Sequence, residues 1–420
     1  MLKEIQKRPF ARPLFWWITG ILLQVCFPLQ QSSVWFMLSV ATIVLFAMMI
    51  AKGGASLSYD ARWVWGAIIA CVLLFLAIQS TAYTEQRLLN PSAPGWLQEK
   101  AKIAQIYLVE RLDRLNLTDS GKAILATLTL NHRQEMSWEI RNQFSTVGVA
   151  HLLSVSGFHV AVVCNFLSIL FSVFPKQMFF RWSRYLLMIS LLWTFAYVAG
   201  LSIPTVRAAL MLSIYLTGQI LGRRQDRYNT LAAAAFCMLL YNPFYLFEVG
   251  FQLSFIAVFF ILYLQPRFSR LIEVRNPLLA TPWNILTVTV AAQIGTVFLC
   301  GYYFRSCSTV FLFTNIFLSL LATVLIPATL LWMFLPAWIP GYGILQWLVE
   351  TLTNHLMWFV ARFSQVPGAA LSLHFDFVTM LSAYGILGLW LCYCRSKRTW
   401  MLFSALSLTL FVLCWQIGMR

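Results

Sequence analysis

Long apolar segments, separated by short polar loops, recur along the whole chain. A helix needs about 20 mainly apolar residues to cross the hydrocarbon core of a bilayer, and these segments come close to that length. The pattern predicts an all-α fold, a polytopic integral membrane protein with about 13 transmembrane helices and short amphipathic helices on the outer side. The predicted spans are residues 13–30, 34–51, 63–82, 148–174, 185–203, 205–221, 228–242, 246–264, 283–301, 309–334, 343–364, 376–394 and 399–418.

Residues 83–147 form the one long stretch that is not predicted to cross the membrane. Apolar residues recur there at steps of three and four, which is the period of a helix with one apolar face. The pattern predicts an amphipathic helix on the outer leaflet or over the mouth of a cavity. Asp119 and Lys122 open a second short helix, and Ser137 caps a third. The apolar stripe of the first helix consists of Leu97, Ala101, Ala104, Leu108, Leu112 and Leu115.

This reading divides the chain into three parts. Residues 1–82 form N-terminal transmembrane hairpins, 83–147 an extracytoplasmic segment with amphipathic helices, and 148–420 a second transmembrane domain. Composition agrees, because 60% of the residues are hydrophobic and only 10% are charged, which excludes a single soluble core.

The basic residues give the predicted spans an orientation. The net charge is +16, and eighteen of the 30 Lys and Arg residues fall in short loops on one side of the membrane. Only Arg207, Arg305, Arg362 and Arg420 lie near outer helix ends or within spans, since the remaining basic residues belong to segment 83–147. Cytoplasmic loops carry an excess of positive charge, so we expect a cytoplasmic N-terminus and an extracytoplasmic C-terminus.

The N-terminus looks at first like a signal peptide. Lys3, Lys7, Arg8 and Arg12 precede the first apolar segment. A small-residue cleavage site is replaced by Pro13, Gln24 and Pro28, and more predicted spans follow. We expect an uncleaved signal anchor.

A first polar group interrupts the predicted span 148–174, at His151, Ser154, Ser156, Gly157 and His159. Unpaired polar groups are costly in lipid, so such residues usually face protein or a wet cavity. On a continuous helix the polar side chains would cover too wide an arc for one narrow seam. A break near Ser156 and Gly157 would instead open the backbone to a polar cavity. The alternative is that the serines bond back to their own helix and the histidines lie at the membrane interface.

A second group lies in the stretch from Gly200 to Ala209. Pro204 follows a Gly and Ser turn and is suited to a helix start. Arg207 runs against the distribution of charge, so we expect a partner such as Glu248, or a phosphate. The alternative is that its side chain reaches out to the membrane surface.

A third group comprises Glu248, Gly250, Gln252 and Ser254. Glu248, Gln252 and Phe255 share a helix face by their spacing, and Gly250 would permit close approach of another helix. Helix packing and lining of a pore both remain open for this group. Further candidates for buried polar residues are Gln293, Asn315, Glu350, Asn354 and His355.

Motifs of hydrolytic chemistry are absent from the sequence. There is no phosphate-binding glycine loop, no His-Glu-x-x-His and no His-x-His-x-Asp-His cluster. The nine cysteines form no Cys-x-x-Cys pair, although Cys300 and Cys307 flank a predicted outer helix end, where a disulfide is left open. The sequence therefore predicts no catalytic residue, no metal and no cofactor, and a chain that is not an enzyme.

Three ordered blocks closely resemble the ComEC family of competence proteins. They are Val149–Val160 with His151 and His159, Gly200–Met211 with Pro204 and Arg207, and Gly250–Val258 with Gln252 and Ser254. The upstream run Ala126–Leu130 also fits, and the likeness covers roughly residues 120–400.

The resemblance implies a channel that passes single-stranded DNA across the bacterial inner membrane during DNA uptake for natural transformation. It also implies an external DNA receptor, and a cytoplasmic motor or the membrane potential as the driving force. The DNA-channel candidates are His151, Ser154, Ser156, Gly157, His159, Pro204, Arg207, Glu248, Gly250, Gln252 and Ser254. A small-molecule or lipid-linked transporter and a membrane-bound enzyme are the alternatives, and the number of copies in the assembly is left open.

Full-length members of that family usually carry an OB-like insertion and often a C-terminal metallo-β-lactamase-like domain. Neither is recognised in this sequence. We therefore expect the membrane channel without these accessory parts.

Overall fold

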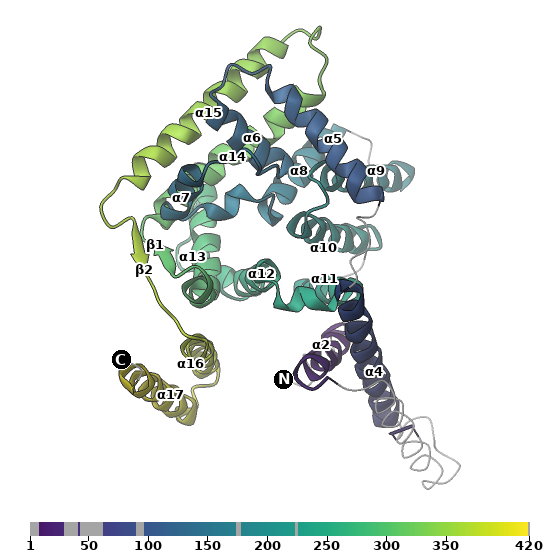
Figure 1. Ribbon diagram of the computed structural model, residues 1–420, viewed down its shortest axis with the longest axis vertical. Helices are drawn as coiled ribbons and strands as arrows, with labels where there is room; N and C mark the ends of the chain where they lie inside the picture. The colour runs from purple at the N-terminus through teal and green to yellow at the C-terminus, as the bar shows by residue number, and fades with distance from the viewer. Residues whose placement is uncertain are drawn as a thin grey trace. The chain divides into compact units, whose positions relative to one another are not determined.

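The computed structural model describes residues 8–28, 41–42, 62–89, 96–173, 178–222 and 226–418. Most of the predicted spans in these ranges correspond to helices (Figure 1). The predicted span 34–51 lies outside the described residues apart from 41–42. The helices at the other predicted spans are α2 (Ala11–Cys26), α4 (Arg62–Leu89), α8 (Gly157–Leu170), α9 (Met178–Val198), α10 (Ile203–Ile220), α11 (Arg227–Tyr241), α12 (Val249–Phe268), α13 (Pro277–Tyr303), α14 (Phe311–Phe334), α15 (Tyr342–Ser364), α16 (Phe377–Ser396) and α17 (Thr399–Gly418).

Within the described residues, five helical stretches are long and apolar enough to cross a membrane by length and composition. They are Gly66–Leu88, Val249–Phe268, Leu279–Tyr303, Phe311–Phe334 and Phe377–Ser396. Shorter apolar helices are Ala11–Cys26, Gly157–Leu170 and Thr399–Trp415. The chain is therefore mainly helical with five candidate membrane spans among its described residues, and the predicted total of thirteen spans is not confirmed.

The segment between the third and fourth predicted spans forms three helices, as its pattern predicts. These are α5 (Trp96–Leu112), α6 (Asp119–Leu130) and α7 (Trp138–Thr146). Ala101, Leu108 and Leu112 of the apolar stripe are buried. Ser137 caps α7 by accepting a hydrogen bond from the backbone N–H of Ile140 at 3.4 Å. Helix α6 is buried along nearly its whole length and packs against α14 and α15.

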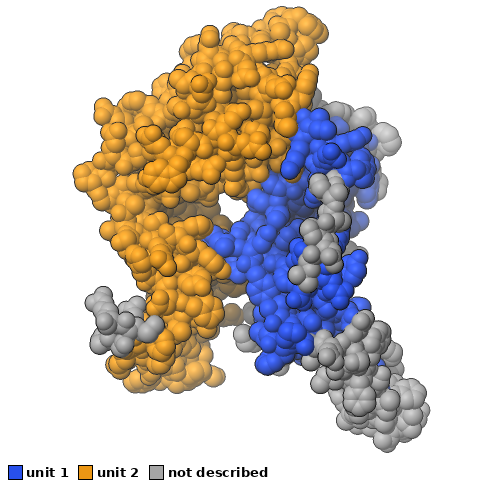
Figure 2. All heavy atoms as spheres, viewed as in Figure 1, with its two compact units in different colours: residues 1–103, 167–197, 201–255 blue, residues 104–166, 198–200, 256–420 orange. Residues whose placement is uncertain are grey.

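The chain divides into two compact units (Figure 2). Unit 1 comprises residues 1–103, 167–197 and 201–255. In it α2 packs against α4 and α11 around a core that includes Trp17, Ile21 and Leu239. The indole N–H of Trp17 donates to the carbonyl of Leu239 at 3.2 Å, so a buried polar atom of this core is satisfied.

Unit 2 comprises residues 104–166, 198–200 and 256–420. In it α13 packs against α14 and α16, α14 against α15, and α16 against α17. Phe260, Leu264 and Ala291 form one of its apolar clusters. The boundaries predicted at residues 82 and 147 stay predictions, because compact units and predicted membrane segments are different divisions of the chain.

A small sheet departs from the predicted all-α fold. Strand β1 (Ser306–Ser308) pairs antiparallel with β2 (Ala370–Ser372), with Cys307 opposite Leu371. The two strands follow α13 and α15, in short loops for which no strand was predicted. Their pairing gives hydrogen-bond partners to backbone groups of the two loops.

Candidate functional site: a broken helix

The helix predicted at 148–174 is interrupted where the first polar group lies. A 3₁₀ turn, η1, covers Ala150–Leu153, Ser154 is extended with φ −139° and ψ 131°, and α8 begins only at Gly157. The predicted break near Ser156 and Gly157 is therefore present. Backbone groups of Ser154, Val155 and Ser156 lie outside any regular helix, so each needs a partner other than the next turn.

His159 supplies one of these partners. Its Nδ1 accepts a hydrogen bond from the backbone N–H of Ser156 at 3.2 Å and lies 3.0 Å from the Ser156 hydroxyl. A backbone N–H can only donate, so Nδ1 is unprotonated and the proton of the neutral ring is on Nε2. His159 is 0% exposed, so its side chain lies in the interior of the protein, whereas His151 is exposed. Its Nε2 has no hydrogen-bond partner in the described part of the chain.

Asn131 supplies a second partner, which the sequence patterns missed. It ends α6 in the left-handed conformation with φ 57°, and its Oδ1 accepts a hydrogen bond from the backbone N–H of Val155 at 3.3 Å. Asparagine tolerates this conformation better than most residues, and its place just after a helical pattern was the available signal. The end of α6 thus holds the break in place.

His151, at the start of the break, belongs to a polar network. Its side chain is exposed, and it interacts with the Asn315 side chain and the Gly148 backbone. Asn315 donates through Nδ2 to the hydroxyl of Thr289 at 2.6 Å, and its Oδ1 accepts from the hydroxyl of Ser319 at 3.2 Å. The network joins η1, α13 and α14, so polar atoms meet inside unit 2 where three apolar segments pack.

Gly148 fixes the chain just before the break. Its φ is +84°, and a Cβ at this position would lie 2.7 Å from the Cβ atoms of both Ser308 and Phe311. Only glycine fits such a backbone and such a space. The adjacent carbonyl of Val147 accepts a hydrogen bond from the hydroxyl of Thr314 at 2.9 Å. Thr314 is completely buried.

The second predicted group lies in unit 1 from Leu201 onward, and its turn has the expected form. Leu201 has φ 49°, its N–H bonds to the carbonyl of Ala196 at 2.9 Å, and α10 begins with Ser202 as N-cap and Pro204 in the first turn. Arg207, one turn further on, is 5% exposed. Its guanidinium does not reach the surface, so the alternative of a surface-seeking arginine is wrong.

Arg207 interacts electrostatically with Glu248, the predicted partner. The ion pairs within 4.0 Å in the described residues are Arg8–Asp226 and Lys122–Asp113, so Arg207 and Glu248 face each other over a longer distance. The Nη1 atom of Arg207 has no hydrogen-bond partner in the described ranges. A buried guanidinium therefore keeps donor capacity that the protein does not use.

The third group begins at the junction between η3 (Pro243–Phe247) and α12. Glu248 is extended with φ −73° and ψ 129°, and its carbonyl accepts from the N–H of Gln252 at 3.0 Å. The Gln252 side chain donates to the carbonyl of Leu246 at 3.0 Å, and Ser254 lies partly buried in α12. Gly250 permits close approach of another helix, but no described residue makes use of this, because a Cβ there would meet nothing within 4 Å.

Two further expectations from the sequence, buried polar residues on α15 and a possible disulfide, can be compared with the structure. Asn354 and His355 are exposed, so they are not buried polar residues. Cys300 and Cys307 are free thiols, so no disulfide joins them. A search of the described residues for three or more His, Cys, Asp or Glu side chains able to hold a metal ion finds no such group.

The predicted site residues thus fall into two sets. His151, Ser154, Ser156, Gly157 and His159 belong to unit 2, and Pro204, Arg207, Glu248, Gly250, Gln252 and Ser254 belong to unit 1. The first set surrounds the helix break, and the second surrounds the starts of α10 and α12.

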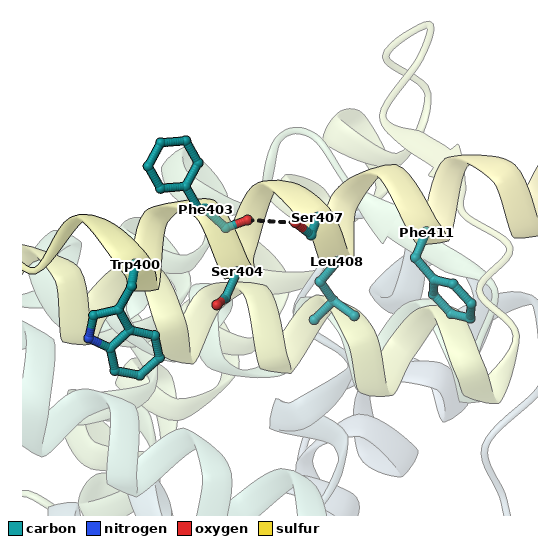
Figure 3. A pocket seen from close by; sticks show the side chains of 6 residues that line it. All are labelled: Trp400, Phe403, Ser404, Ser407, Leu408 and Phe411. Carbon is teal, nitrogen blue, oxygen red and sulfur yellow. Dashed lines mark hydrogen bonds between the residues drawn. The ribbon is translucent and has the colours of Figure 1, made fainter.

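A shallow groove of about 620 Å³ runs along α17 and contains no predicted site residue (Figure 3). The hydroxyl of Ser407 donates to the carbonyl of Phe403 at 2.9 Å, so this serine is already satisfied by its own helix. The lining consists of Trp400, Phe403, Ser404, Ser407, Leu408 and Phe411. A mainly apolar wall from one helix fits contact with acyl chains rather than polar recognition.

Comparison with known proteins places this geometry in a family context. The family model described as "Competence protein" matches residues 128–398, which contain both sets of site residues. ComE operon protein 3 of Bacillus subtilis (strain 168) is 28% identical over 228 residues, which are 54% of this chain and 28% of that protein. An uncharacterised protein of Aquifex aeolicus (strain VF5) is 29% identical over 167 residues, 40% of this chain and 38% of that protein. The matches thus cover well under half of each relative. No solved structure matches the chain.

Proposed function

The chain belongs to the Competence protein family, and we propose that it forms a transmembrane channel for single-stranded DNA in the bacterial inner membrane during DNA uptake for natural transformation. The observation that carries the proposal is the helix break at Ser154–Ser156, inside the region that the family model matches. Irregular backbone at membrane depth is tolerated where it lines a polar cavity or is buried in protein. Such a break is a starting point for a path that a polyanion can follow.

Polar residues on two candidate spans support a wet path beside the break. Thr289 and Gln293 lie four residues apart on α13, as do Asn315 and Ser319 on α14, so each pair shares one helix face. DNA carries one negative charge per phosphate and cannot enter hydrocarbon, so a conduit must present polar groups to it. The network of Asn315, Thr289 and Ser319 supplies such groups, and exposed His151 adds an imidazole.

Arg207 is the proposed phosphate contact in unit 1. Its buried guanidinium retains an unused donor atom, and Glu248 balances part of its charge when no DNA is bound. Sequence-independent passage requires contacts to the backbone rather than to base edges. A bidentate donor such as arginine suits this task.

The proposed arrangement in the cell follows the sequence analysis. The chain spans the inner membrane several times with its N-terminus in the cytoplasm and its C-terminus outside. Its proposed partners are membrane lipid, an external DNA receptor and a cytoplasmic motor protein. A further copy of the same chain is a candidate partner, and the number of copies is left open.

We assign no hydrolytic step to this chain. The Ser156–His159 pair has the spacing of a nucleophile and a base, but its second hydrogen bond comes from the backbone N–H of Ser156, as in a helix cap. A third residue would be needed at Nε2 to orient the ring as in a catalytic triad, and none of the described residues bonds there. The pair is assigned a structural role.

Uptake of labelled DNA tests the proposal. A host strain that lacks the gene is compared with the same strain carrying it, and the label that becomes protected from external nuclease is measured. We expect surface-bound label in both strains and protected single strands only where the gene is present. Equal protected label in both would sink the channel proposal and favour a small-molecule or lipid-linked transporter.

A further inference from the structure

Two arginines hydrogen-bond at the connection between α6 and α7: Arg133 lies in the loop, and Arg141 lies in the first turns of α7. Arg133 donates through Nη2 to Oδ1 of Asn131 at 3.5 Å, and Arg141 donates through Nη2 to the carbonyl of Arg133 at 2.9 Å. Both side chains are exposed, and both acceptors are neutral. Each guanidinium has five N–H donors, so most of their donor capacity remains for a ligand.

Neither arginine has an acid within 4.0 Å in the described part of the chain. Glu135 and Glu139 are close in sequence, yet the ion pairs within 4.0 Å there involve Arg8 and Lys122 instead. Partial burial and then the charge of Arg141 lower the pKa of Arg133 below its ordinary value. Two like charges that lie close together with no acid within 4.0 Å are stabilised when an anion binds between them.

An aromatic ring accompanies the two charges. Trp138 is 78% exposed and lies three residues before Arg141 on α7, so the two side chains are neighbours on one side of the helix. Sites for single-stranded nucleic acid combine basic side chains that follow the backbone with aromatic rings on which bases stack. The loop and the first turns of α7 offer both.

The loop is also tied to the helix break. Oδ1 of Asn131 accepts from Arg133 and from the backbone N–H of Val155, so one side chain joins the arginines to the break. An anionic lipid headgroup would satisfy the arginines and the tryptophan equally well, but it would not require this connection. The connection favours a strand that continues toward the break.

We propose that Arg133, Trp138 and Arg141 form a binding site for single-stranded DNA, in which the arginines contact phosphates and the tryptophan stacks on a base. This inference rests on the proposed function and names the contact through which a strand meets the break. Asn131 acts as a positioning residue, because it holds both the arginine loop and the backbone at Val155.

Binding of a fluorescent oligothymidine to the full chain in discs of phosphatidylcholine tests the site, since this lipid carries no net charge. The double variant Arg133→Gln/Arg141→Gln should weaken binding about tenfold or more and make its salt dependence shallower, because fewer phosphates are neutralised. Trp138→Ala should cost about tenfold. The matched control Arg111→Gln/Arg114→Gln removes two charges from the end of α5 and the loop after it, and should bind nearly as wild type does.

If the glutamine form does not fold, the variant Arg133→Lys/Arg141→Lys is used instead. It keeps both positive charges and should retain most of the salt dependence of binding. Equal affinity of the glutamine double variant and its control would overturn the site. Variants that keep their affinity for DNA but no longer enrich anionic lipid around the protein would also overturn the site. The bound anion would then be a lipid headgroup. Wild type that fails to bind the oligothymidine would also overturn the site, and the uptake assay then decides separately whether the channel proposal survives.

Discussion

His159 Nδ1 lies 3.2 Å from the backbone nitrogen of Ser156, three residues earlier at the start of α8. In a capping box, a glutamate or glutamine at the third helical position accepts a hydrogen bond from the backbone N–H of the N-cap residue. Here a histidine fills that role at the edge of a helix break. The ring is held in one tautomer, with Nε2–H directed into the protein where no described residue accepts from it.

We predict that His159→Gln retains the fold and most DNA uptake, because the amide oxygen can still accept from Ser156. His159→Ala removes the acceptor and leaves a cavity, which should lower the free energy of unfolding by about 1–3 kcal/mol. Thermal unfolding in detergent checks the fold, and protected label checks uptake. His355→Ala, at an exposed histidine, is the control.

The same variants address a metal. We expect no stoichiometric zinc in purified wild type, and no change in unfolding temperature on treatment with a chelator. Zinc bound one to one by wild type and lost in His159→Gln would contradict the hydrogen-bonding role.

Gly148→Ala should destabilise the region before the break. A Cβ at 2.7 Å from both Ser308 and Phe311 forces a shift, and the φ of +84° is unfavourable for alanine, so we expect a loss of about 1–3 kcal/mol. Gly250→Ala is the matched control, because its Cβ would enter open space. Unfolding temperatures measured side by side decide the matter, and equal values for the two variants would mean that the strain at Gly148 is absent.

Arg207 and Glu248 form the third test. If Arg207 contacts phosphates, Arg207→Lys and Arg207→Ala should both reach normal levels in the membrane, with uptake lowest in the alanine form. If it mainly balances Glu248 in the fold, Arg207→Ala should lower the membrane level severalfold, and adding Glu248→Gln should partly restore it. Normal level and normal uptake in Arg207→Ala would contradict both roles.

Arg8 and Asp226 give a prediction for pH. Partial desolvation raises the pKa of Asp226, but hydrogen bonds from the Arg8 side chain and from the backbone of Asn229 and Tyr228 outweigh it and bring the pKa below its ordinary value. A carboxylate with a depressed folded pKa stabilises the protein above its unfolded pKa, and this stabilisation is lost as pH falls through the folded pKa.

The advantage in unfolding temperature of wild type over Asp226→Asn should therefore be constant from about pH 7 to pH 5 and shrink below about pH 4. Thermal unfolding of both proteins across this range measures it. An advantage that grows on acidification would have the wrong sign for this ion pair.

The sequence predicts local features of this chain better than contacts between distant segments. The break at Ser156 and Gly157 follows from a polar arc too wide for one helix seam, and the cap at Ser137 follows from local side-chain chemistry. The turn before Pro204 is readable for the same reason.

Contacts across the chain were not readable from one sequence. Asn131 is 24 residues from Val155, and no periodicity joins them. Gly250 looked like a site of close helix approach, but small residues permit such approach without requiring it. The β1–β2 pair arises because two loops far apart in sequence meet, so neither short segment alone predicts a strand.

The central claim is that single-stranded DNA passes through this chain, and cross-linking of DNA in transit tests it most directly. Donor DNA with photoreactive thymine analogues and a bulky end group that halts entry is added to competent cells, which are then irradiated. We predict that the halted strand cross-links to this protein, at peptides that include His151–His159. The claim would be contradicted if the halted strand formed no cross-link to this chain while the same DNA without the end group entered the cells freely.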